Sequence, residues 1–168
     1  MKIVIVGAGK VGYSLAQRLI QDDHDVYVID RSPERIHNLE NTLDVSLVLG
    51  NGSDVQLLNE IDMSDVGMFI AVTDSDEVNM LSCSVAKIKG VPTTIARVRD
   101  NSVAEHMDEE IRAQLGVDLF INPEYCDGSL DGSRSGTWRV RCGACNFDRT
   151  GHFGCVFTFD FLLPDAAV

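Results

Sequence analysis

The 168-residue chain has few positive charges and no long apolar segment. It holds 14 Lys and Arg against 26 Asp and Glu, a formal net charge of −12, and residues 1–123 alone contain 10 against 20. An acidic balance of this kind disfavours a nucleic-acid partner. There is no run of 18 apolar residues. The first strand-like segment begins at residue 2, in place of the charged and apolar parts of a signal peptide. We therefore expect a soluble, intracellular protein.

The cysteines are unevenly placed along the chain. The chain has five, an odd number that does not fit a secreted disulfide framework, and only Cys83 precedes residue 123. On a predicted helix, Cys83 is interpreted as a small buried hydrophobic residue. The remaining cysteines could form a zinc set with a nearby histidine, but their spacing is unusual and no regular fold flanks them, so we predict no metal site. That set would comprise Cys142, Cys145, His152 and Cys155.

The first predicted strand runs directly into a glycine-rich turn. Residues 2–6 are a short β-branched run, typical of a strand buried on both faces of a parallel sheet, and a helical apolar pattern begins at residue 11. Between them, Gly7 should allow a tight turn, Gly9 should leave room for a pyrophosphate, and Gly12 should let helix and strand pack closely. The helix N-terminus would then direct free N–H groups at the phosphates.

A second strand-like segment supports this interpretation. It covers residues 26–29 and ends in Asp30, about 20 residues beyond the glycine turn, where a carboxylate can accept hydrogen bonds from a ribose diol. Without such a partner the G-x-G-x-x-G pattern would be a weak signal. Together the two segments predict a site for an adenine dinucleotide or a related nucleotide.

Strand-like and helix-like segments alternate without a break to residue 121. Further strands are expected at 46–49, 68–72, 94–98 and 118–121, with amphipathic helices between them and no tight hairpins. This alternation predicts an α/β fold, a Rossmann-like doubly wound parallel six-stranded sheet of order 3-2-1-4-5-6. Composition changes after residue 125, so we predict a nucleotide-binding domain at 1–125 and an irregular tail, not a native folded domain, at 126–168.

Catalytic groups are missing from the strand ends, where ligands of such folds bind. No histidine follows a predicted strand, and His24, His37 and His106 are interpreted as surface residues. A dehydrogenase also needs a proton donor or acceptor and usually a second domain for the substrate. We therefore predict that the chain is not an enzyme. The alternative is a fragment of an NAD-dependent oxidoreductase that lacks its substrate domain.

Several segments together resemble the RCK (KTN) domain family over residues 1 to about 125. The most specific is Ala71-Val72-Thr73-Asp74-Ser75-Asp76-Glu77-Val78-Asn79, and the glycine turn, Asp30-Arg31, Gly50-Asn51-Gly52-Ser53-Asp54, Ile95-Ala96-Arg97-Val98 and Ile121-Asn122-Pro123-Glu124 agree with it. The resemblance implies a cytoplasmic regulatory subunit that gates a potassium-transporting membrane protein when it binds NAD(H), or alternatively ATP or ADP. It also implies a peripheral location at the inner face of the membrane, and a dimer or tetramer ring when full length. After Tyr125 the sequence departs from the family pattern, which continues with a crossover helix used for dimerisation.

The resemblance also implies a role for each candidate site residue. The turn from Gly7 to Val11 would hold the phosphates and Asp30 the ribose, so NAD(H) should bind better than NADP(H). Thr73 and Asp74 would border the far half of the nucleotide, and Arg97 would reach a phosphate or an adjacent ring. Arg31 would stack near adenine or alternatively take a 2′-phosphate. The full expected set is Gly7, Ala8, Gly9, Lys10, Val11, Gly12, Asp30, Arg31, Gly52, Ser53, Thr73, Asp74 and Arg97.

Overall fold

The computed structural model describes residues 1–100 and 109–121 and, as backbone, two further strands at 140–147 and 153–159. The chain divides into two compact units, Met1–Asn122 and Pro123–Val168. Within the described residues, no helix is both long and apolar enough to span a membrane.

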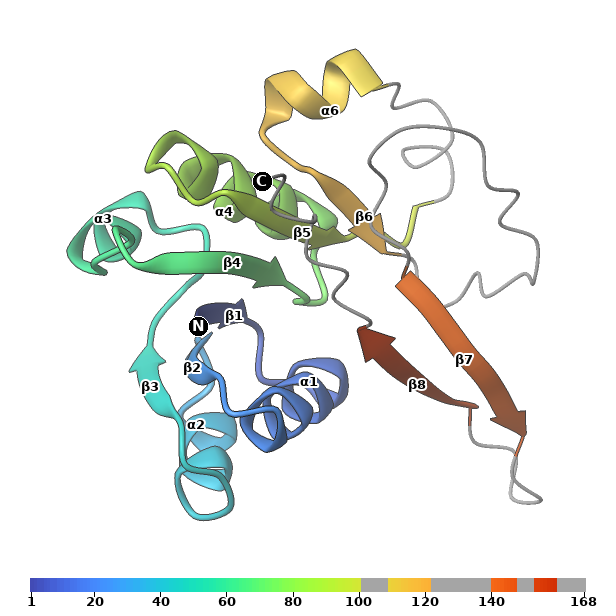
Figure 1. Cartoon of the computed structure of the whole chain (residues 1–168). Helices are drawn as coiled ribbons and strands as arrows, with labels where there is room; N and C mark the ends of the chain where they lie inside the picture. Colours follow the sequence, from blue (N-terminus) through green and yellow to red (C-terminus); the bar gives the residue numbers. More distant parts are fainter. Residues whose placement is uncertain (101–108, 122–139, 148–152, 160–168) are drawn as a thin grey trace, which may run out of the picture. The chain divides into compact units, whose positions relative to one another are not determined.

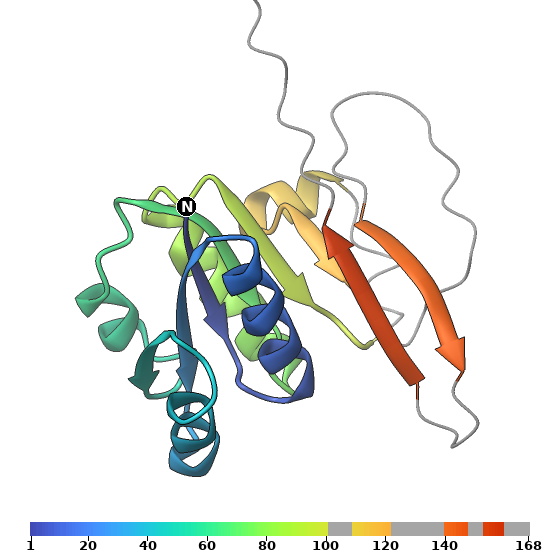
Figure 2. The ribbon, with the colours of Figure 1, turned by 60° about the horizontal axis from the view of Figure 1, so that its bottom comes forward.

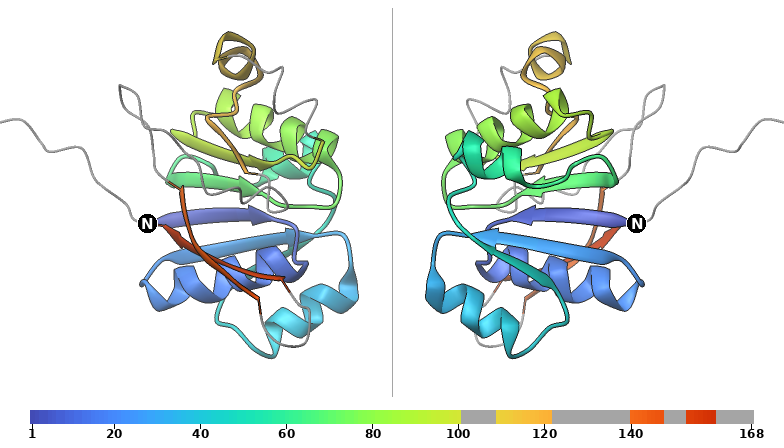
Figure 3. Two further views of the ribbon diagram at one scale, coloured as in Figure 1. Left: turned by 90° about the vertical axis from the view of Figure 1, so that its right-hand side faces the viewer. Right: turned by 90° about the vertical axis from the view of Figure 1, so that its left-hand side faces the viewer.

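The first unit is built on one parallel sheet (Figure 1). Its strand order is β3-β2-β1-β4-β5-β6, and each neighbouring pair runs parallel, which confirms the predicted doubly wound topology. Figure 3 shows β2, β1, β4 and β5 stacked in this order. The strands are β1 (Lys2–Val6), β2 (Asp25–Asp30), β3 (Ser46–Leu49), β4 (Val66–Ala71), β5 (Thr93–Arg97) and β6 (Leu119–Ile121).

Helices cover both faces of this sheet (Figure 2). Right-handed crossovers between parallel strands place α1 and α2 on one face and α3 and α4 on the other. Val4 and Val6 of β1 are fully buried and share a core cluster with Leu58 of α3 and with Cys83 and Ala86 of α4. The helices are α1 (Lys10–Gln21), α2 (Pro33–Glu40), α3 (Val55–Glu60), α4 (Asp76–Ile88) and α6 (Glu109–Leu115).

Local signals in the sequence fix where the helices begin and end. The Ser32 hydroxyl accepts a hydrogen bond from the Arg35 N–H and Pro33 is the first residue of α2, as the capping pattern predicts. Gly90 follows α4 with a φ of +91°, a conformation that favours glycine at a helix end. Between β5 and β6 the structure describes helix α6 from Glu109 to Leu115, and residues 101–108 lie outside the described part.

Cys83 is buried on α4, as predicted. Its side chain has no exposed surface, and its Sγ lies 3.4 Å from the carbonyl oxygen of Ile95. Burial raises the pKa of the Cys83 thiol to about 12, so the thiolate that would act as a nucleophile does not form near neutral pH. His37 lies on the surface, with Nδ1 3.5 Å from Glu40 Oε2, and His106 lies outside the described residues.

The second unit contains regular structure that the sequence analysis did not predict. Strands β7 (Val140–Phe147) and β8 (Phe153–Phe159) pair in antiparallel orientation, where the sequence analysis expected no strand. That residues 126–168 are not a native folded domain stays a prediction. The register of the pair shifts between Gly143 and Asn146, and such an irregularity interrupts the alternation by which a strand is recognised in sequence. His152 and the side chains of the tail cysteines lie outside the description, so the absence of zinc stays a prediction.

Candidate functional site

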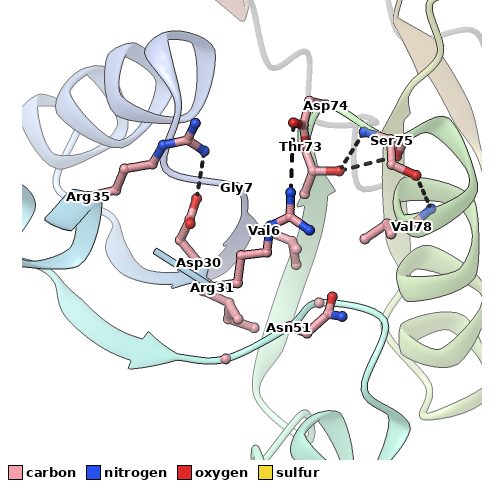
Figure 4. Close-up of a pocket in the computed structure, with 13 residues that line it drawn as sticks. Val6, Gly7, Asp30, Arg31, Arg35, Asn51, Thr73, Asp74, Ser75 and Val78 are labelled. Carbon is pink, nitrogen blue, oxygen red and sulfur yellow. Dashed lines mark hydrogen bonds and ion pairs between the residues drawn. The ribbon is translucent and has the colours of Figure 1, made fainter. Parts of the chain in front are cut away.

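A cavity lies at the carboxyl ends of the strands, at the point where the chain order in the sheet reverses between β1 and β4 (Figure 4). This is the place where open doubly wound sheets bind their ligands. The loops that follow β1, β2, β3 and β4 all contribute to it. The lining residues are Val6, Gly7, Ile29, Asp30, Arg31, Arg35, Gly50, Asn51, Gly52, Thr73, Asp74, Ser75 and Val78.

The three glycines of the turn differ in what surrounds them. Gly7 has a φ of +105°, and a Cβ on it would lie 3.0 Å from the backbone of Val72 and Thr73. A Cβ on Gly12 would lie 1.8 Å from the carbonyl oxygen of Gly7, so only glycine lets α1 start this close to β1. These findings confirm the predicted turn and close packing. At Gly9 a Cβ would meet nothing within 4 Å, which leaves open space beside the backbone.

Among the described residues, no side chain accepts a hydrogen bond from the start of α1. Gly9 is its N-cap residue, no side chain caps it, and its first turn has no acidic residue. By contrast, Ser32, Asp54 and Ser75 accept hydrogen bonds from the first turns of α2, α3 and α4. The first N–H groups of α1, including those of Lys10 and Val11, therefore suit an anionic ligand.

Asp30 lies at the end of β2 and is 5% exposed. Its Oδ2 accepts a hydrogen bond of 2.6 Å from the backbone N–H of Ala8, and its Oδ1 accepts one of 2.8 Å from that of Ser32. Arg35 Nη1 lies 3.5 Å from Oδ2. The carboxylate thus fixes the glycine turn to the end of β2. It keeps acceptor capacity on a cavity-lining side chain, because two ionised oxygens offer about four lone-pair positions.

Asn79 organises the loop after β4, a role that the sequence analysis missed. Its side chain is fully buried, and its Oδ1 accepts hydrogen bonds from the N–H (2.8 Å) and hydroxyl (2.7 Å) of Thr73. Its Nδ2 donates to the carbonyl oxygen of Arg97 at 2.8 Å. One amide therefore ties the end of β4 to the end of β5. The quoted motif contains Asn79, but the sequence does not mark this side chain as buried, since the buried face of α4 consists of Asn79, Ser82, Cys83 and Ala86.

Asn79→Ala is expected to lower the free energy of unfolding by about 2–4 kcal/mol, because the N–H of Thr73 and the carbonyl of Arg97 lose their buried partner. Urea unfolding followed by circular dichroism measures the change. The matched control is Asn38→Ala on α2, whose position is exposed and whose substitution should cost under about 0.5 kcal/mol. Equal unfolding midpoints for the two variants would contradict the assigned role of Asn79.

Of three further residues predicted for the site, Gly52 lines the cavity, whereas Ser53 and Arg97 do not. Gly52 lines the cavity next to Val6, where a Cβ would lie 2.1 Å from Val6 Cγ1. Ser53 lies beyond the lining, and its N–H donates to Asn51 Oδ1 at 3.1 Å. Arg97, at the end of β5, also lies outside the lining; its Nε is buried without a hydrogen-bond partner in the described structure. Arg35, Asn51, Ser75 and Val78 line the cavity but were not predicted.

Comparison with known protein families gives a match to the TrkA-N domain over residues 3–123. The Trk system potassium uptake protein TrkA of Halomonas elongata is 39% identical over 125 residues, which cover 74% of this chain and 27% of the relative. A homologue of TrkA from Methanothermobacter thermautotrophicus is 40% identical over 124 residues, 74% of this chain and 55% of the relative. The chain thus spans between about a quarter and about half the length of these curated relatives.

Solved structures share the fold of the first unit. The TrkA-N domain of the inner membrane protein ybaL from Escherichia coli superimposes with a TM-score of 0.62 at 22% identity, covering 73% of this chain and 87% of that one. The GsuK channel bound to NAD gives a TM-score of 0.61 at 21% identity and covers 71% of this chain and 21% of the channel. GsuK has also been solved bound to ADP, with a TM-score of 0.61, 20% identity and coverage of 73% and 31%.

Proposed function

Because the chain belongs to the TrkA-N domain family, we propose that it is the nucleotide-binding regulatory domain of a potassium uptake system. The nucleotide would be NAD(H), or alternatively ATP or ADP. The observation that carries the proposal is the cavity at the switch point of the sheet, bordered by an uncapped helix start and by the buried carboxylate of Asp30. The GsuK structures with bound NAD and with bound ADP add support at the level of the fold.

The residues present fit an adenine nucleotide. Open space beside Gly9 and the free N–H groups at the start of α1 suit a pyrophosphate, which needs close approach to the backbone. Asp30 would accept hydrogen bonds from the ribose hydroxyls, while Arg31 and Arg35 bring positive charge to the same cavity in an otherwise acidic chain. Thr73 and Asp74 would border the far half of the ligand. We also propose that Arg97 comes within reach of a phosphate or a neighbouring ring.

The regulatory role extends to partners and location. Relatives named as potassium uptake proteins support a potassium-transporting membrane protein as the partner. The domain would then lie in the cytoplasm, peripheral to the inner face of the membrane, and form a dimer or tetramer ring as part of a longer protein. Binding can regulate transport only if the nucleotide has different affinities for two states of that assembly. The names of the relatives favour regulation over the oxidoreductase alternative, and we propose that the chain is not an enzyme.

Calorimetric titration of the purified chain with NADH, NAD, ATP and ADP tests the proposed site. One nucleotide should bind per chain, and NADH and ADP should compete, because both would place an adenosine diphosphate in the same cavity. Simultaneous binding of both, or no binding of any of the four, would overturn the assignment. Rubidium uptake by cells carrying Asp30→Asn in the full-length protein tests the regulatory role, which predicts that the response of uptake to the nucleotide is lost.

A further inference from the structure

An ion pair crosses the cavity between its two halves (Figure 4). Arg31 follows β2, Asp74 follows β4, and both line the cavity. Arg31 Nη2 lies 3.9 Å from Asp74 Oδ2, and the two side chains are 73% and 66% exposed. The pair is therefore a loose contact at the mouth of the cavity, of a kind that costs at most about 1 kcal/mol to separate. A ligand that competes for either partner can open it.

The loop that carries Asp74 has a defined position. Thr73 is held by the buried amide of Asn79, the N–H of Ser75 donates to the Thr73 hydroxyl at 3.2 Å, and Arg99 donates a side-chain hydrogen bond to the carbonyl oxygen of Asp74. The backbone at residue 74 is thus anchored from two sides. Arg31 has the longer side chain of the two and is 73% exposed, so a ligand can draw it away from Asp74 without displacing this loop.

The second pair of charges in the cavity, Asp30 and Arg35, is of opposite sign and lies in contact. Among the described residues that line it, four are charged, namely Asp30, Arg31, Arg35 and Asp74. Arg35 lies 3.5 Å from the carboxylate of Asp30, so these two neutralise each other at the end of β2. The carboxylate expected to repel a 2′-phosphate is therefore partly compensated. Arg31 is therefore the cation that a phosphate at the ribose end of the cavity would contact. Its availability depends on whether it stays paired with Asp74.

We propose that Asp74 sets the preference of the site between adenine dinucleotides without and with a 2′-phosphate, by engaging Arg31. This inference rests on the proposed function. A 2′-phosphate is recognised best by a guanidinium that can make two parallel hydrogen bonds, and Arg31 is the residue next to the ribose-binding Asp30. NADPH must take Arg31 from Asp74 before it gains that contact. NADH has a neutral 2′-hydroxyl and meets no such competition.

The inference is tested by titrating the purified chain with NADH and NADPH in a calorimeter at one fixed salt concentration. In Asp74→Asn, which keeps the size of the side chain, the affinity for NADPH relative to that for NADH should rise about three- to fivefold. The gain must require the guanidinium, so it should disappear in the double variant Arg31→Gln/Asp74→Asn. Asp22→Asn is the matched control, since it breaks an exposed Arg18–Asp22 pair at the far end of α1.

The outcomes distinguish this inference from the proposed function. If wild-type protein binds neither dinucleotide, this inference is overturned, and the proposed function is overturned with it only if NAD, ATP and ADP also fail to bind. If NADH binds but Asp74→Asn changes NADH and NADPH equally, or no more than Asp22→Asn does, the role of Asp74 is overturned and the nucleotide site stands. If the gain in NADPH affinity persists without Arg31, the assignment to Arg31 is overturned.

Discussion

Gly12→Ala is expected to destabilise the first unit by about 3 kcal/mol or more, and to leave much of the protein unfolded in moderate urea. The added Cβ would lie 1.8 Å from the carbonyl oxygen of Gly7 and 2.9 Å from its carbonyl carbon. Both contacts are with backbone atoms at the junction of β1 and α1, so no side-chain rotation relieves them. The better helix propensity of alanine offsets only about 1 kcal/mol of this destabilisation. Urea unfolding followed by circular dichroism measures the loss.

Gly9→Ala is the matched control three residues earlier in the same turn. Its backbone is extended, with a φ of −71°, and a Cβ there meets nothing within 4 Å. The free energy of unfolding should therefore stay within about 1 kcal/mol of the wild-type value. The proposed site predicts that the methyl group nevertheless weakens NADH binding, because it occupies the room assigned to the pyrophosphate. Similar unfolding midpoints for Gly12→Ala and Gly9→Ala would contradict the packing argument.

Asp30→Ala should weaken NADH binding by about 10- to 100-fold, equivalent to roughly 1.5–3 kcal/mol, because charge-assisted hydrogen bonds to the ribose hydroxyls are lost. ATP shares the ribose and should lose a similar amount. The preference of the wild type for NADH over NADPH should also narrow in the variant. Calorimetric titration of wild type and variant with the three nucleotides measures these changes. NADPH binding more tightly than NADH to the wild type would instead assign the ribose end to Arg31.

The structural role of Asp30 has to be separated from its role in binding. Asp30 accepts hydrogen bonds from Ala8 and Ser32, so its replacement also removes two backbone contacts. Asp54→Ala is the matched control, because Asp54 accepts from the N–H groups of Gln56 and Leu57 but is not among the residues lining the cavity. It should lower stability without altering the NADH affinity of the folded protein. Unchanged NADH affinity in folded Asp30→Asn would contradict the ribose assignment.

The sequence by itself determined the parallel sheet and its order, because β-branched runs mark buried strands and the segments between them have helical apolar patterns. Residues such as Ser32-Pro33 and Gly90 also mark where individual helices begin or end. Topology then followed, because parallel strands joined by helices take right-handed crossovers. Six of the thirteen expected site residues line the cavity, since strand ends converge at one edge of a parallel sheet: Gly7, Asp30, Arg31, Gly52, Thr73 and Asp74.

Only the tertiary structure decided which of these groups contact one another. Arg35 and Asp30 are five residues apart, and Arg31 and Asp74 are 43 apart, and nothing in either spacing predicts an ion pair. The buried amide of Asn79 joins two strand ends through loops whose conformation depends on distant backbone. In the tail, the pairing of β7 with β8 shifts register near Gly143. The shift interrupts the alternation of apolar and polar residues from which a strand could have been predicted. Side-chain partners across loops are long-range contacts, whereas periodicity and capping report only on neighbours along the chain.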